Sequence, residues 1–178
     1  GIDKTSMRSI AAEANMTTGA IYYYYKNKQD LFAEIVTDSI HFAHRIFHEN
    51  KKEKITVDSL FSDVEKEARI RFKRLQEEKL YLLLLSDAMK CDSEFSQKYT
   101  SGLKSILDQA ATLFASAFAL DDRKLAEQFA SIFMATLDGF AIQQVLHAIP
   151  KDDTSYADTI LDFFTTCVPY YIEKHRES

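Results

Sequence analysis

The sequence has 178 residues, of which 46% are hydrophobic, and a formal net charge of −5 at pH 7. A chain of this size is expected to bury about 70% of the surface that its unfolded form exposes, as a soluble protein of one or two domains does. The negative charge argues against a protein that coats nucleic acid indiscriminately, because such proteins are usually basic. A local DNA-binding end remains compatible with it, since the charges between residues 3 and 30 nearly balance.

Secondary-structure breakers are rare, with 4 Gly and 2 Pro in the whole chain, and no run alternates strictly between apolar and polar residues. We therefore predict an all-α fold. Cys91 and Cys167 lie far apart without metal-ligand spacing, so we expect reduced thiols, a cytoplasmic protein, no metal site and no cofactor. No apolar run reaches the roughly 18 residues of a membrane span, so no membrane partner is expected.

The first predicted helix carries an apolar stripe with i, i+3, i+4, i+7 spacing, which is typical of an amphipathic helix. Thr5 or Ser6 can cap its amino-terminal end. The stripe comprises Met7, Ile10, Ala11 and Ala14.

A turn of three to four residues follows, as in helix-turn-helix units. Asn15 tolerates the left-handed conformation that often ends a helix, and Met16 can point inward. Thr17 or Thr18 can cap the next helix.

Four consecutive tyrosines lie on this second helix, and because each residue turns by about 100° they cannot share one face. Outward phenols beside a residue without a side chain suit a surface that approaches a polyanion closely, and DNA is the obvious candidate. The spacing places Ile21 and Tyr25 on one side with Tyr24 flanking it, and Gly19, Tyr22 and Tyr23 on the other.

Asn27 and Asp30 resemble a capping box and begin a long linking helix. The charged stretch 49–54 interrupts its apolar stripe, so we divide the chain into residues 1–48 and residues 49–178. Pro169 should end or kink the last helix. Further helices are expected at 57–89, with a break near Glu77, and at 93–120, 122–148 and 154–175.

Residues 5–31 contain, in order, a Thr/Ser-started helix with Ile-Ala-x-x-Ala, a short turn, Gly-x-Ile-Tyr, and Lys-x-x-Leu at the start of the linking helix. This pattern closely resembles the helix-turn-helix of TetR-family transcriptional regulators. The resemblance implies a DNA-binding domain joined to a helical domain for effector binding and dimerisation. Family members have a further helix ahead of the position of Gly1; it is absent from this chain, and we expect the protein itself to possess it.

The resemblance implies that the second helix enters the DNA major groove and that Arg8 reaches in from the first helix. Arg8 is the sharpest candidate for base reading, because a guanidinium can bond guanine O6 and N7 together, which contributes about 1–3 kcal/mol of discrimination. Thr5, Ser6, Tyr22 and Lys28 would hold phosphates. The full set of expected DNA-binding residues is Thr5, Ser6, Arg8, Thr17, Thr18, Gly19, Ala20, Tyr22, Tyr23, Tyr24 and Lys28.

The family architecture also implies a homodimer on a palindromic operator and a small-molecule effector within the second domain. The alternative for the dimer residues, and the favoured alternative for each pocket aromatic taken singly, is a place in the monomer core, whereas the polar Gln144 and His147 are assigned to the pocket. The dimer interface is expected to include Ala135, Gly139, Phe163, Phe164, Cys167 and Tyr171. The effector pocket is expected to include Phe72, Met89, Phe95, Tyr99, Phe133, Leu137, Gln144 and His147.

We therefore expect a sequence-specific transcriptional regulator, most simply a dimeric repressor that an effector releases from double-stranded DNA. The alternative is a helical small-molecule-binding or interaction protein that does not bind DNA. An enzyme is not expected, because the sequence shows no nucleophile–base set, glycine-rich phosphate loop or metal spacing.

Overall fold

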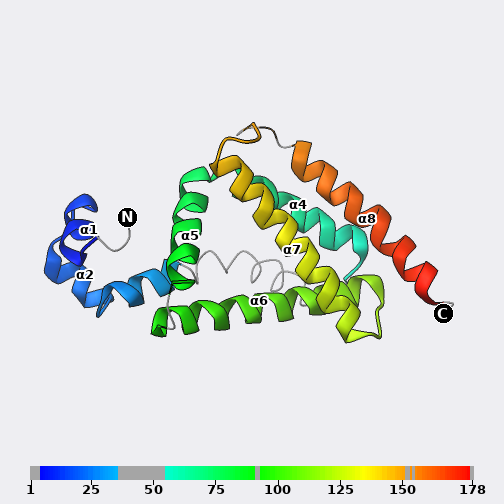
Figure 1. Ribbon diagram of the computed structural model, residues 1–178, viewed down its shortest axis with the longest axis horizontal. Helices are drawn as coiled ribbons and strands as arrows, with labels where there is room; N and C mark the ends of the chain where they lie inside the picture. The colour runs from blue at the N-terminus through cyan, green and yellow to red at the C-terminus, as the bar shows by residue number, and fades with distance from the viewer. Residues whose placement is uncertain (1–4, 36–54, 91–92, 151–152, 154, 177–178) are drawn as a thin grey trace. The chain divides into compact units, whose positions relative to one another are not determined.

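The computed structural model describes residues 5–35, 55–90, 93–150, 153 and 155–176, and every regular element among them is a helix (Figure 1). The all-α prediction is confirmed for this part of the chain. A helical segment over 28–35 follows the first two helices. The labelled helices are α1 (Met7–Glu13), α2 (Thr18–Tyr24), α4 (Val57–Lys73), α5 (Leu75–Ala88), α6 (Glu94–Phe118), α7 (Arg123–Val145) and α8 (Ser155–Arg176).

Side chains that precede the helices cap them as their residue types indicate. Ser6 Oγ accepts a hydrogen bond from the Ser9 amide, and the Ser9 hydroxyl accepts one from the Ser6 amide, which closes a capping box at α1. Thr17 Oγ1 accepts from the Ala20 amide at the start of α2. Such caps are worth about 1 kcal/mol each, because they satisfy amides that have no partner within the helix.

Residues in the left-handed region follow three helices: Asn15 (φ 54°) after α1, Ala119 (φ 50°) after α6 and His147 (φ 59°) after α7. The prediction for Asn15 is confirmed. Met16 donates its amide to the Ala11 carbonyl at 2.8 Å, yet its side chain is 39% exposed, so the expected inward position is wrong. The backbone bond closes the turn without requiring the thioether to enter the core.

One expected helix break is present, and one expected helix end is not. The break between α4 and α5 falls at Arg74 (φ −101°, ψ 54°) rather than near Glu77. Helix α8 continues through Pro169 to Arg176, so the proline does not end it. Val168 and Ile172 are buried, whereas Pro169 is exposed, so packing holds the helix together while the missing backbone bond lies on its solvent side.

The chain forms two compact units, of which unit 1 draws on residues 1–41 and 79–104, and unit 2 on residues 42–78 and 105–178. Helices α5 and α6 therefore contribute to both. The boundary expected between residues 48 and 49 lies outside the described residues and stays a prediction. Unit 1 includes residues 79–104, which the linear division assigned to the second region.

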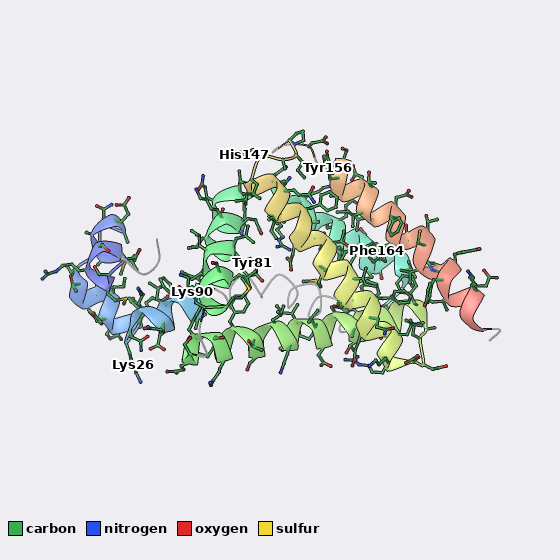
Figure 2. The ribbon with its side chains drawn as sticks, viewed as in Figure 1. Lys26, Tyr81, Lys90, His147, Tyr156 and Phe164 are labelled. Atoms are coloured by element: carbon green, nitrogen blue, oxygen red, sulfur yellow. The ribbon has the colours of Figure 1, made fainter. Side chains whose placement is uncertain are left out.

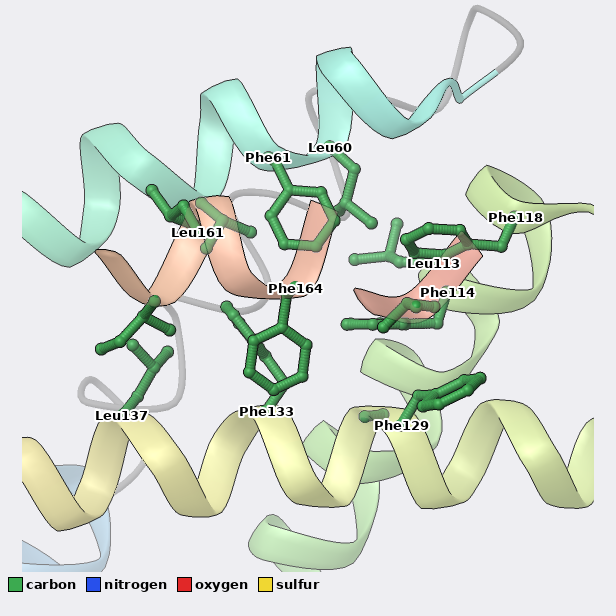
Figure 3. Close-up of a cluster of buried hydrophobic side chains, with 14 of the residues drawn as sticks. Leu60, Phe61, Leu113, Phe114, Phe118, Phe129, Phe133, Leu137, Leu161 and Phe164 are labelled. Carbon is green, nitrogen blue, oxygen red and sulfur yellow. The ribbon is translucent and has the colours of Figure 1, made fainter. Parts of the chain in front are cut away.

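An aromatic cluster fills the core of unit 2 (Figure 3). The rings of Phe61, Phe114 and Phe133 lie edge-on or tilted to one another with centroids 5.8–6.2 Å apart. Phe164 of α8 meets Phe133 of α7 edge-on at 4.8 Å. Fully burying such side chains contributes about 1.5–3 kcal/mol each, so α4, α6, α7 and α8 are held by a common core.

Helix α7 is the one described helix whose length and apolar composition would also allow a membrane crossing. A buried core helix passes the same test. Phe129, Phe133 and Leu137 of α7 lie in the core of unit 2, which accounts for part of the apolar composition.

Candidate nucleic-acid interface

Helices α1 and α2 are held together by a small apolar cluster within unit 1. Met7, Ala11 and Ile21 are buried in it, and Tyr25 and Leu31 pack against it from the segments that follow. Met7, Ile10 and Ala11 of the predicted stripe therefore meet the side of α2 that carries Ile21 and Tyr25. Ala14 does not, because α1 ends at Glu13 and Ala14 is its exposed C-cap. This packing leaves the opposite side of α2 for a partner.

The outer side of α2 is aromatic. Tyr22 is 51% exposed, Tyr23 84% and Tyr24 68%, and the rings of Tyr23 and Tyr24 meet edge-on at 5.1 Å. The spacing placed Tyr24 beside the buried side, but in the folded chain it belongs to the exposed group. Each phenol offers a hydrogen-bonding hydroxyl and a flat apolar ring to whatever lies against this helix.

Gly19 lies in the first turn of α2, amid this aromatic surface. Its φ is not positive, so its backbone conformation is open to any residue. A Cβ built on Gly19 would have Thr17 Oγ1, at 4.0 Å, as its nearest neighbour. Neither conformation nor packing within the described structure therefore requires a glycine here.

Arg8 is exposed on α1, where a guanidinium can reach a partner. The hydroxyls of Ser6 and Thr17 serve as helix caps, whereas Thr18 and Ala20 are half-buried on α2. The caps order the first turns of the two helices and thereby position the neighbouring exposed side chains.

Lys28 is engaged within the protein. Its Nζ donates a hydrogen bond to the Thr5 carbonyl at 3.1 Å, and it lies 5.7 Å from the centroid of the Phe32 ring. Lys26, two residues earlier, is exposed (Figure 2). The two lysines therefore occupy different environments, which sequence spacing did not distinguish.

The residues expected to line an effector pocket are divided between the units. In unit 1, Phe95 and Tyr99 are buried, and Phe95 meets Phe32 at 6.3 Å. Met89, just after α5, is 72% exposed. The buried pair belongs to the apolar cluster that joins the 28–35 segment to α5 and α6 within this unit.

In unit 2, Phe133 and Leu137 are part of the buried core. Gln144 is 2% exposed, so its amide needs polar partners within the fold. His147 is exposed just after α7, where its left-handed backbone ends the helix (Figure 2). The side chain of Phe72 lies outside the described part of the chain.

The residues expected at a dimer interface occupy mixed positions. Phe163 is 59% and Tyr171 44% exposed, and Ala135 and Cys167 are exposed as well. Phe164 is 3% exposed and packs in the core of unit 2. For this residue the structure agrees with the alternative prediction, a role in the monomer core.

An ion network in unit 2 was not singled out from the sequence. The Arg71 guanidinium bonds both Glu78 oxygens, at 2.8 and 3.1 Å, and Asp138 Oδ1 at 2.7 Å. Burial alone lowers the pKa of Arg71, but the hydrogen bond and charge of Glu78, with those of Asp138, outweigh it and hold the pKa above its ordinary value. Arg71 lies on α4 and Glu78 on α5, so these bonds join the two helices on either side of the break at Arg74.

Among the described residues no three His, Cys, Asp or Glu side chains gather as metal ligands.

The exposed aromatic surface on α2 is the feature of unit 1 that best suits contact with a binding partner. Its position on the second of two short, tightly connected helices defines a helix-turn-helix unit of the DNA-binding class.

Comparison with known proteins agrees with the assignment of a helix-turn-helix unit. Residues 1–35 match the model of the bacterial regulatory proteins of the tetR family. The chain is 43% identical over 47 residues, 26% of its length, to an uncharacterized HTH-type transcriptional regulator of Haemophilus influenzae, and it is 51% identical over 35 residues, 20% of its length, to the HTH-type transcriptional regulator AcrR of Shigella flexneri. These matches span 21% and 16% of the two relatives.

The helix-turn-helix region of this chain belongs to the TetR family of transcriptional regulators. The family resemblance is thereby confirmed, and it supports DNA-binding transcriptional regulation.

Proposed function

We propose that the protein is a dimeric transcriptional regulator that binds a palindromic operator through α2 and is released from it by a small-molecule effector. The observation that carries the proposal is the exposed aromatic face around Gly19. Three neighbouring tyrosines at 51–84% exposure are a large apolar and hydrogen-bonding surface with no role in the core of unit 1.

Gly19 strengthens the argument for DNA. Within a helix a glycine is about 0.5–1 kcal/mol less stable than an alanine, so its presence needs a reason. The described fold supplies none, because the nearest neighbour of an added Cβ is 4.0 Å away. A partner surface that comes within contact of the α2 backbone supplies one, and a base-pair edge in the major groove is such a surface.

The residues proposed to contact DNA then divide into two roles. Arg8, Tyr23 and Tyr24 reach base edges, and Thr18, Gly19 and Ala20 form the short-side-chain surface beside them. Thr5, Ser6, Thr17 and Tyr22 contact the sugar-phosphate backbone, which sets the register without reading sequence.

A dimer would present two helix-turn-helix regions to the DNA. The exposed side of α7 supports dimerisation. Ile132 is 55%, Ile142 40% and Leu146 72% exposed. With Ala135 and Gly139 they follow alternating spacings of three and four residues, which is one side of a helix. A Cβ on Gly139 would meet nothing within 4 Å in this chain, so close approach of a second helix explains that glycine too.

The apolar surface on α8 extends the proposed interface. Phe163 and Tyr170 are 59% and 69% exposed, and Cys167 and Tyr171 lie on the same helix. Burying these groups against a second copy is favoured by the hydrophobic effect. A twofold dimer would present the α2 helices to successive major grooves about one DNA turn apart.

An effector acts by binding two conformations unequally. In unit 2, Phe133 and Leu137 of α7 offer apolar side chains and Gln144 offers an amide, and an apolar lining with a few polar groups is what such ligands need. We therefore assign effector binding to the helical region that follows the 28–35 segment, and we place the protein in the cytoplasm as a repressor.

The test is selection of duplexes from a random-sequence library by the full-length protein, followed by fluorescence anisotropy on the enriched duplex. Specific binding that survives scrambled competitor and weakens with salt is expected. Tyr23→Ala should weaken it, whereas Ile70→Ala, at an exposed apolar position on α4, should not. Failure to enrich any sequence, or equal weak binding to enriched and scrambled duplexes, would contradict the proposal and favour a helical protein that does not bind DNA.

A further inference from the structure

The peptide unit between Thr5 and Ser6 is held at both of its polar groups. The Thr5 carbonyl accepts a hydrogen bond from Lys28 Nζ at 3.1 Å. The Ser6 amide donates to Ser9 Oγ at 3.0 Å as part of the capping box. Because Ser6 is the N-cap of α1, this peptide sets where the helix starts and in which direction it leaves.

The other side of the Lys28 ammonium lies against the core of unit 1. It is 5.7 Å from the centroid of the Phe32 ring, within the range of a cation–π attraction. Phe32 is 6% exposed and meets Phe95 of α6 edge-on at 6.3 Å. Lys28 therefore lies between a buried aromatic cluster and the first turn of α1, and its bond to Thr5 spans 23 residues of the chain.

Resting on the proposed function, we propose that Lys28 is a positioning residue: its ammonium fixes the first turn of α1, and with it Arg8, relative to the 28–35 segment, instead of binding a DNA phosphate. Arg8 lies two residues after the N-cap, so a change in the start of α1 moves it directly. The anchoring of Phe32 against Phe95 means that the position of Lys28 follows α6.

The contrast with Lys26 supports this assignment. Lys26 is exposed, whereas Lys28 is half-buried and already donates a hydrogen bond within the protein. A lysine that binds phosphate acts as a point charge and adds about one unit to the slope of log affinity against log salt. A lysine that positions another residue changes affinity without changing that slope.

The experiment measures the salt dependence of binding to the enriched duplex for wild type, Lys28→Met, Lys28→Arg and the matched control Lys26→Met. Hydrogen exchange of the α1 amides in the DNA-free proteins is the second readout. We expect Lys28→Met to bind about tenfold more weakly at every salt concentration with the wild-type slope, as loss of a hydrogen bond from a charged group predicts. Its α1 amides should exchange faster, and its discrimination at the base read by Arg8 should fall.

Lys28→Arg keeps the positive charge, and it serves as the test variant if Lys28→Met does not fold. A phosphate ligand would tolerate arginine, which binds phosphate well, whereas the positioning role predicts weaker binding and faster α1 exchange. A slope lowered by about one unit in Lys28→Met, or wild-type exchange in both variants, would overturn the proposal. Absence of any enriched duplex, with faster α1 exchange still seen in the variants, would instead locate the failure in the proposed DNA-binding function, because exchange is measured without DNA.

Discussion

Replacing Gly19 by alanine should stabilise the fold and weaken DNA binding, two effects of opposite sign from one methyl group. The added Cβ would lie 4.0 Å from Thr17 Oγ1, which is ordinary contact, so no rearrangement is needed. An alanine in a helix is about 0.5–1 kcal/mol more stable than a glycine, and we expect the free energy of unfolding to rise by up to that amount.

In the complex the same methyl group lies where α2 is proposed to touch base edges. Displacing α2 enough to lose one good base contact costs about 1–3 kcal/mol, which is roughly 5- to 150-fold in affinity per half-site. Urea unfolding followed by circular dichroism measures the first effect, and fluorescence anisotropy on the enriched duplex measures the second.

A graded series provides the control. Gly19→Leu places a larger side chain at the same position while leucine remains a good helix former, so affinity should fall further at nearly unchanged stability. Wild-type affinity in both variants would refute the reasoning, because it would show that the Gly19 backbone is not close to DNA. Lower stability in Gly19→Ala would refute the premise that the fold does not need the glycine.

Three further predictions concern unit 2. Gly139→Leu should raise the dimer dissociation constant tenfold or more, measured by sedimentation, since overpacking a close helix contact costs about 1–3 kcal/mol; an unchanged dimer would exclude α7 as the interface. Arg71→Met should lower the free energy of unfolding by about 3 kcal/mol because it leaves Glu78 buried without its cation, and Arg71→Met with Glu78→Met should recover part of it; a loss below about 0.5 kcal/mol in the single variant would contradict this account. Ala119→Gly should raise the urea midpoint, since relief of about 1–2 kcal/mol of left-handed strain exceeds the roughly 0.5–1 kcal/mol entropy cost of glycine; a lower midpoint would count against it.

Local features of this protein were accessible from the sequence because they depend on residues within a few positions of one another. The Ser6 and Thr17 caps and the left-handed Asn15 follow from side-chain chemistry next to the backbone they satisfy. The burial of Ile21 and exposure of Tyr23 follow from the helical period. These features are enough to identify the helix-turn-helix unit, and the family comparison confirms it.

Interactions between residues distant in sequence were decided by tertiary structure alone. The hydrogen bond from the Lys28 ammonium to the Thr5 carbonyl could not be read from the sequence, and Arg71 meets Asp138 across 67 positions. Phe164 could have faced a partner or the core, and its ring lies against Phe133. Periodicity indicates that a residue lies on an apolar or polar side of its helix, but which helix covers that side depends on how the whole chain packs, because burial is non-directional and many pairings satisfy the same pattern.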